Sequence, residues 1–231
     1  MKIRFALLCS LFAGILVSVS CGPSAEELRQ QQLLRDRFVD VILHSPEKWN
    51  ETRKKIARPS LFGLHLKDVV LTGLDLSGAD LTGARIESVI FIDCNLSYLK
   101  TEGTVFSDVR IENSEVRILE ISHGSVIEES VIMDSNVQNL SVVGAKGRIE
   151  NVTFVNSDLS WMKFDSAVIR NVTIERSVVK NGDVILLQEV KKLVIKDSDI
   201  TGMTYYPYQP EEDIHIVNSH PCDGPWKGFC E

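Results

Sequence analysis

Large apolar residues recur every five positions through the middle of the chain. Counted outward from Leu76, fourteen of the fifteen such positions between Leu61 and Val131 are large and apolar, and the exception is Thr101. The residues between them are mostly small, polar or charged. A five-residue period is neither the 3.6 residues of an α-helix nor the two residues of a β-strand. A repeat this regular takes precedence over predictions for individual elements.

The period changes register twice along the chain. A second series of eight apolar residues runs from Ile149 to Val184, out of register with the first. We place the first change within 132–148, where the sequence GAKG at 144–147 indicates a turn. A last short series has changed register again and contains Val190, Ile195 and Ile200.

One inward side chain in every five suits a chain that turns a corner after each pentapeptide. Gly78 and Gly83 suit the corners because glycine tolerates a positive φ. The residue two positions before each large one, such as Ala79 or Cys94, is small enough to lie inside beside it. Stacked coils of this kind would pair their backbones about 4.8 Å apart.

The sequence ADLTG at 79–83 resembles the A(D/N)LxG unit of pentapeptide-repeat proteins. The resemblance covers about 61–200 and is strongest at 71–86. It implies an all-β fold, a right-handed quadrilateral β-helix with four pentapeptides per coil. Later coils are expected to be wider or more irregular, because other residues often replace Ala at the second inward position: Val109, Ser114, Met162 and Gly182.

The competing interpretation is a β-sandwich, since Val and Ile are abundant. A sandwich predicts apolar residues at every second position, with turns about every 8–12 residues. It does not account for a five-residue period held through so many units, and we therefore favour the solenoid.

Both ends of a solenoid need to be covered. The sequence SAEE at 24–27 predicts a capping box that opens a helix reaching about His44. Ser45 and Pro46 predict the start of a short second helix that carries Trp49. We divide the chain into a signal peptide at 1–20, a lipid-anchor linker and helical cap at 21–58, a β-helix at 59–202 and a C-terminal cap at 203–231.

The first residues predict export. Lys2 and Arg4 precede an apolar run that is shorter than the roughly 20 residues of a membrane-spanning helix. The sequence VSVSC at 17–21 resembles a bacterial lipobox, in which the cysteine is acylated and becomes the first mature residue. Cys21 would then carry the lipid, palmitate included, and anchor the protein to a membrane. Gly22 resembles the class sorted to the outer membrane, and an ordinary signal peptide cleaved nearby is the alternative.

The cysteines predict one disulfide. Cys21 is assigned to the lipid, and Cys94 falls on an inward position. Cys222 and Cys230 remain, which suits a single disulfide in an oxidising compartment. The alternative is a metal site built from these two cysteines and the two histidines nearby, His215 and His220. We expect no metal and no cofactor.

The net charge and the predicted export of the protein argue against a nucleic-acid partner. Without Lys2 and Arg4 the chain has 23 basic and 32 acidic residues, a net charge of −9, which disfavours binding to nucleic acid. Some pentapeptide-repeat proteins mimic DNA and bind gyrase, but an exported, tethered protein would not meet a cytoplasmic enzyme.

No catalytic motif stands out, and we expect a protein that is not an enzyme. A β-helix enzyme or binder that acts on envelope glycans is the alternative. An enzyme of that kind would need clustered carboxylates, and the nearest candidates, Asp158, Asp165 and Glu175, fall on different sides of a four-sided coil.

The leading hypothesis is a lipid-anchored scaffold at the bacterial outer membrane, facing the periplasm, that binds an unidentified envelope protein. A more specific version is a pilot-like lipoprotein for a secretion or envelope complex. Aromatic residues are favoured at the centres of interfaces, which makes the segment with Tyr205, Tyr206 and Tyr208 a candidate for partner binding. Capping of the last coil is the other role of this segment, and the one that we favour. Several apolar residues are also predicted to face outward: Ile90, Ile92, Val105, Ile118 and Ile127.

Overall fold

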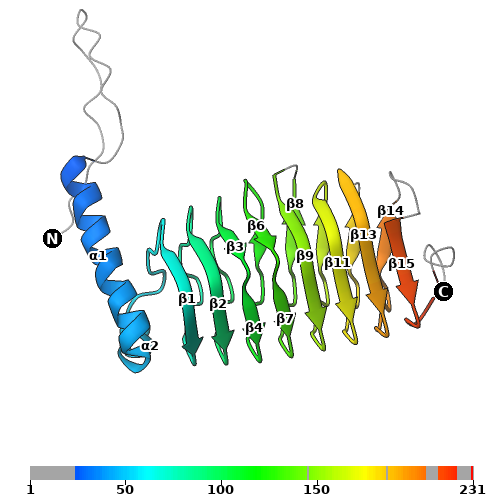
Figure 1. Ribbon diagram of the computed structural model, residues 1–231, viewed down its shortest axis with the longest axis horizontal. Coiled ribbons are helices and arrows are strands. Elements are labelled where there is room, and N and C mark those ends of the chain that lie inside the picture. Colours follow the sequence, from blue (N-terminus) through cyan, green and yellow to red (C-terminus); the bar gives the residue numbers. More distant parts are fainter. Residues whose placement is uncertain (1–23, 145, 186, 207–212, 223–229, 231) are drawn as a thin grey trace, which may run out of the picture.

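Two helices are followed by a long stack of short strands (Figure 1). The computed structural model describes residues 24–144, 146–185, 187–206, 213–222 and 230. Helix α1 (Ala25–His44) lies across the N-terminal end of the stack, and α2 (Pro46–Arg53) follows it directly. The predicted capping box is confirmed, because Ser24 and Glu27 bond each other's backbone N–H.

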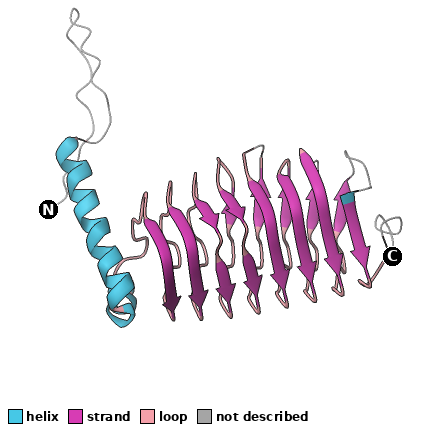
Figure 2. Ribbon diagram, viewed as in Figure 1, coloured by secondary structure: helices cyan, strands magenta, loops and turns pink. Residues whose placement is uncertain are grey.

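The strands form two parallel sheets (Figure 2). The ten-stranded sheet contains β1 (His65–Thr72), β2 (Arg85–Ile92), β3 (Val105–Ser107), β4 (Arg110–Glu112), β6 (Val126–Glu128), β7 (Val131–Met133), β9 (Arg148–Val155), β11 (Val168–Glu175), β13 (Glu189–Lys196) and β15 (Ile214–Val217). The five-stranded sheet contains β5 (Glu120–Ile121), β8 (Ser141–Val143), β10 (Lys163–Asp165), β12 (Asp183–Ile185) and β14 (Thr204–Tyr206). Each strand pairs with its equivalent in the next coil, so the fold is the predicted parallel β-solenoid.

Each coil turns at four corners, and each corner is a residue with a positive φ. The first corner contains Asp68, Ser88, Asp108, Glu129, Asn151, Asn171 and Lys192, and the second contains Gly73, Asp93, Asn113, Asp134, Asn156, Arg176, Asp197 and Asn218. The third contains Gly78, Tyr98, Ile118, Asn139, Trp161, Asn181 and Gly202, and the fourth contains Gly63, Gly83, Gly103, His123, Gly124, Gly144 and Ser166. The predicted corner role of Gly78 and Gly83 is confirmed.

The corners divide the solenoid into four sides. The ten-stranded sheet covers the two sides that meet at the first corner, because β2 pairs with β3 before Ser88 and with β4 after it. The five-stranded sheet covers the side between the third and fourth corners. The side between the second and third corners is held by single bridges, such as Asp75 to Asn95.

The five-residue series fills the core. Every position of the series from Leu61 to Ile121 is buried, as is every position from Ile149 to Val184. Cys94 is also buried, at 2% exposure, and this burial raises the pKa of its thiol. The thiol therefore packs as a small apolar group.

A register change that the sequence pattern did not reveal precedes the predicted one, so the inward assignment of Val126 and Val131 was wrong. Ile127 and Ile132 point inward, with exposures of 4% and 1%, whereas Val126 and Val131 are half-buried on the outer surface. The change occurs at the fourth corner, where His123 and Gly124 both have a positive φ (51° and 91°). Because two consecutive residues form this corner, the coil that contains it has 21 residues, whereas the earlier coils have 20.

A second register change occurs in the predicted turn at 144–147. Gly147 lies against the preceding coil, and a Cβ on it would lie 2.4 Å from the carbonyl oxygen of Ile121. Only glycine fits there, and the next large inward side chain after Val142 is that of Ile149.

A column of serines runs through the interior behind the second corner. Each hydroxyl donates to the carbonyl two residues earlier and accepts the N–H of the column residue one coil before, at 3.0 to 3.3 Å. The column begins at Cys94 and contains Ser114, Ser135, Ser157, Ser177, Ser198 and Ser219. Serine there is a hydrogen-bonding element rather than an irregularity.

Helix α2 replaces the hydrogen bonds of a missing coil. Each coil bonds the backbone of the one before it, so the first coil would leave groups unpaired at its edge. Asn50 bonds the carbonyl of Gly73 and the N–H of Asp75, at 2.7 and 2.9 Å. Trp49 bonds the carbonyl of Asp75, and Arg53 bonds that of Ser77.

Candidate functional site

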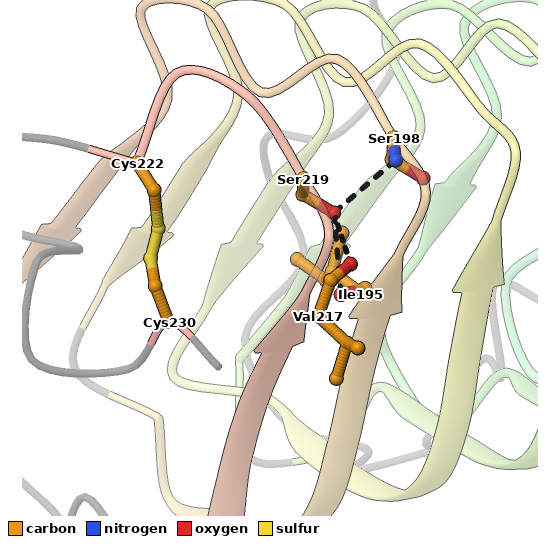
Figure 3. The surroundings of a disulfide bond; sticks show 6 residues. All are labelled: Ile195, Ser198, Val217, Ser219, Cys222 and Cys230. Carbon is orange, nitrogen blue, oxygen red and sulfur yellow. Dashed lines mark hydrogen bonds between the residues drawn. A yellow bond between two sulfur atoms is a disulfide. The ribbon is translucent and has the colours of Figure 1, made fainter.

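The structure joins Cys222 and Cys230 as a disulfide beside the last coil (Figure 3). Their Cα atoms are 6.3 Å apart, and Cys230 forms a bridge with Ile216 in β15. With both sulfurs in a disulfide, neither is available as a thiolate for a metal. Among the residues that the structure describes, no group of three or more His, Cys, Asp or Glu side chains could hold a metal ion.

Tyr205 lies in the core and is not available to a partner. The Tyr205 side chain is 7% exposed and belongs to the core, so the prediction that it presents a ring to a partner is corrected. Its position pairs with Val184 in the coil before, so it is one more inward residue of the repeat. Tyr206 lies in β14, but its side chain falls outside the described residues, and so do Tyr208 and the lipidation candidate Cys21.

The predicted outward isoleucines divide into three cases. Ile90 and Ile92 lie on the outer surface of β2 but are half-buried, since they pair with both neighbouring coils. Ile127 is buried in the core and is not available to a partner. Ile118 is 46% exposed and lies at the third corner.

The third corner carries a line of exposed large side chains that sequence reasoning found only in part. Tyr98, Ile118 and Trp161 are 56%, 46% and 59% exposed, and all three have a positive φ, between 55° and 64°. Glycine and asparagine are the usual residues in that conformation, and a β-branched residue there is an outlier. We call the exposed line formed by Tyr98, Ile118, Asn139, Trp161 and Asn181 the third-corner ridge.

The ridge could have been found from the repeat. Each corner residue follows an inward residue by two positions, so Tyr98, Ile118 and Trp161 occupy a place where the other units carry Gly, Asn or another polar residue. Once the register of the repeat is known, the sequence shows that these three residues differ from the usual corner residues.

A groove lies on the five-stranded side of the first coils. Its volume is about 1000 Å³. We call it the N-terminal groove; Tyr98 and Ile118 line it from the third corner, and His123 lines it from the fourth. Arg58, from the segment after α2, and Glu102 also line it. Its wall therefore combines apolar, aromatic and oppositely charged groups.

The described residues that line the groove do not form a catalytic triad, in which a carboxylate orients a base and the base activates a nucleophile. The Ser122 hydroxyl lies 2.6 Å from Glu120 Oε1 and 2.8 Å from His123 Nδ1. A catalytic arrangement requires the carboxylate to orient the base from its far side. Here the carboxylate accepts from the serine itself, so this cluster orders the corner.

The carboxylates considered for an enzyme are separate and already bonded. Partial burial raises the pKa of Asp158, but hydrogen bonds from Ser160 and Gln138 outweigh it and bring the pKa below its ordinary value. The hydrogen bond from Lys163 likewise lowers the pKa of Asp165. The two residues lie on different sides of the solenoid, as predicted, and neither has the raised pKa of a general acid.

Glu175, the third carboxylate considered, is paired with Lys196 at 2.9 Å and also contacts Arg176. It lies on the outer surface of β11, away from both other carboxylates. No shared acid–base site follows from these three residues.

A comparison with protein-family models supports the identification of pentapeptide repeats. The family model for pentapeptide repeats matches residues 60–97 with eight copies. Comparison with curated proteins found no match. Among the helices that the structure describes, none combines the length and hydropathy needed to span a membrane.

Solved structures with a similar chain path include full-length QnrB1, a plasmid-mediated fluoroquinolone resistance protein. It is 13% identical over 70% of this chain and 90% of its own, with a TM-score of 0.37. HetL, involved in heterocyst differentiation regulation in the cyanobacterium Nostoc sp. strain PCC 7120, is 12% identical over 68% of this chain and 89% of its own, with a TM-score of 0.23. Likenesses this distant carry no argument about function. Residues 60–97 thus match pentapeptide repeats, and the stacked coils that continue from them give the chain the pentapeptide-repeat fold, a parallel β-solenoid behind an N-terminal helical cap.

Proposed function

We propose that this protein is a membrane-anchored, non-enzymatic scaffold that holds a protein partner in the N-terminal groove. The groove offers Arg58 and Glu102 for charged contacts and the Tyr98 ring for apolar contact. Aromatic and arginine side chains contribute most to the binding energy of protein interfaces. A lining that combines charged and aromatic groups is better suited to contact with a protein surface than to binding a small ligand of uniform polarity.

The observation that carries the proposal is the exposure of Ile118 together with its unfavourable backbone conformation. Ile118 lies on the wall of the groove, 46% exposed, with a φ of 55°. That conformation costs a β-branched residue on the order of 1–3 kcal/mol. Folding does not require isoleucine there, because Asn139 and Asn181 occupy the same corner in later coils. Contact with a partner gives a reason for an apolar side chain at this place.

The anchor in the proposal is Cys21, carrying lipid at the outer membrane and facing the periplasm. It precedes the helix cap Ser24 by three residues, a reach of about 10 Å when extended. Helix α1 and the N-terminal groove lie at the same end of the solenoid. A partner in the groove would therefore be held near the membrane.

The test is crosslinking in cells followed by purification of the tagged, full-length protein. Four variants are compared with the wild type: Cys21→Ser, Ile118→Asn, Glu102→Lys and Glu129→Lys. Glu129 is the matched control, because it lies at the first corner, opposite the third, where Lys192 shows that lysine is accommodated.

We expect one abundant crosslinked protein in the wild type and in Glu129→Lys, and its loss in Ile118→Asn and Glu102→Lys. Cys21→Ser should move the protein from the membrane fraction to the soluble fraction. Capture that is equal in all groove variants would overturn the groove as the site. A Cys21→Ser variant that stays in the membrane fraction would overturn the anchor.

A further inference from the structure

The third-corner ridge continues well beyond the N-terminal groove. Trp161 lies three coils after Tyr98 and does not line the groove. At the other three corners, every described residue with a positive φ is glycine or polar. Among the described residues, large apolar groups in this unfavourable conformation therefore lie along one edge, and Trp161 needs an explanation that the groove does not supply.

The shape of the ridge favours a linear ligand. Coils rise by about 4.8 Å, so the rings of Tyr98 and Trp161 start about 14 Å apart along the solenoid. A corner one residue wide is a convex line, whereas a standard protein interface covers about 800 Å² on each partner. The rise of one coil is close to the length of one sugar unit in an extended polysaccharide, and the flat apolar face of a sugar stacks on an exposed aromatic ring.

The polar groups beside the ridge favour a neutral ligand. Asn139 lies between the two rings, Asn181 lies one coil beyond Trp161, and both are exposed amides that donate and accept hydrogen bonds. The cations that flank the ridge are each paired with a carboxylate: Lys100 with Asp80 at 3.4 Å, Arg117 with Glu115 at 3.1 Å, Lys163 with Asp165 at 3.0 Å and Lys180 with Asp199 at 3.0 Å. These four cations therefore offer no unpaired positive charge to a polyanion along the ridge.

We infer that the third-corner ridge binds a neutral linear polysaccharide, laid along the solenoid axis and stacked on Tyr98 and Trp161. Asn139 hydrogen-bonds the sugar hydroxyls between the two rings. This site goes beyond the proposed protein scaffold: Tyr98 and Ile118 belong to both the groove and the ridge, whereas Trp161 belongs to the ridge and does not line the groove. A chain of at least three or four sugar units is needed to reach both rings.

The test is titration of the full-length lipidated protein, in a detergent without sugar groups, with cellohexaose, chitohexaose and laminarihexaose. A sulfated heparin hexasaccharide is the charged control. Binding is followed by calorimetry and tryptophan fluorescence in the wild type, Trp161→Asn, Trp161→Tyr and Tyr98→Asn. Asparagine is the native residue at this corner in two other coils, so these variants should fold, and their melting temperatures check this.

We expect at least one neutral hexamer to bind, with affinity about tenfold weaker in Trp161→Asn and Tyr98→Asn and close to the wild type in Trp161→Tyr. The heparin hexasaccharide should not bind. The inference is overturned if no neutral hexamer binds, or if Trp161→Asn binds as tightly as the wild type. Loss of the crosslinked protein partner in Trp161→Asn, without sugar binding in the wild type, would instead assign the ridge to that protein.

Discussion

The indole nitrogen of Trp49 donates a hydrogen bond of 2.7 Å to the carbonyl oxygen of Asp75, and the Trp49 side chain is 1% exposed. This bond links the helical cap to the first coil at a place where later coils use the backbone. Trp49→Phe keeps most of the apolar burial but removes the donor. We expect a loss of about 1 kcal/mol in the free energy of unfolding, measured by urea denaturation. Trp161→Phe, at an exposed position, is the matched control and should change little.

The serine column should be costly to interrupt. Ser157 accepts the N–H of Ser135 and donates to the carbonyl of Val155. Ser157→Ala leaves the buried N–H of Ser135 without this acceptor, whereas the carbonyl of Val155 keeps the N–H of Asp134, so we expect a loss of about 1–3 kcal/mol in the free energy of unfolding. Ser60→Ala, at an exposed position, serves as the reference. Equal stability of the two variants would mean that the serine column does not contribute to the free energy of unfolding.

The register after the fourth corner can be tested by charge. Ile127→Asp would place an unpaired carboxylate in the core and lose roughly 1.5–3 kcal/mol of apolar burial. We expect this variant to unfold or aggregate in circular dichroism and size-exclusion experiments. Val126→Asp, one residue away on the outer surface, should fold. The opposite result would restore the uninterrupted five-residue register.

The strain at Ile118 should appear as a gain in stability when it is relieved. Ile118→Asn replaces a β-branched residue at φ 55° with one that accepts this conformation. We expect the free energy of unfolding to rise by about 1 kcal/mol, while capture of the partner falls. A stability loss in thermal melts would show instead that Ile118 supports the fold.

Acid should weaken the ion pairs on β11 and β13. Hydrogen bonds from Arg170 and then Lys191 lower the pKa of Glu189 from 4.5 to about 2. Because the folded pKa is the lower one, the pair stabilises the protein above about pH 4.5, and this contribution is lost as the pH falls toward 2. Wild type should therefore melt above Glu189→Gln at pH 7, and the difference should shrink over that range. A difference that stays constant down to pH 2 would contradict the assignment.

Much of the fold could be predicted from the five-residue period. The inward positions from Leu61 to Ile121 and from Ile149 to Val184 followed from the side-chain pattern, because a core fixed by one residue in five has little freedom. The start of α1 followed from Ser24 and Glu27, since capping is a local interaction. The error at Ile127 arose because Val126, Ile127 and Val131 are all apolar, and the pattern alone does not show which of two adjacent residues turns inward.

The sequence by itself determined the repeat, the coil, the helical cap and the inventory of cysteines, because each depends on neighbours a few residues apart. Only the tertiary structure decided which corner residues share an edge. Tyr98 and Trp161 are 63 positions apart in the chain, yet they occupy the same corner because the intervening coils have 20, 21 and 22 residues. Stacking brings residues that are far apart in the sequence into one ridge, and it makes Ile118 part of both the ridge and the groove.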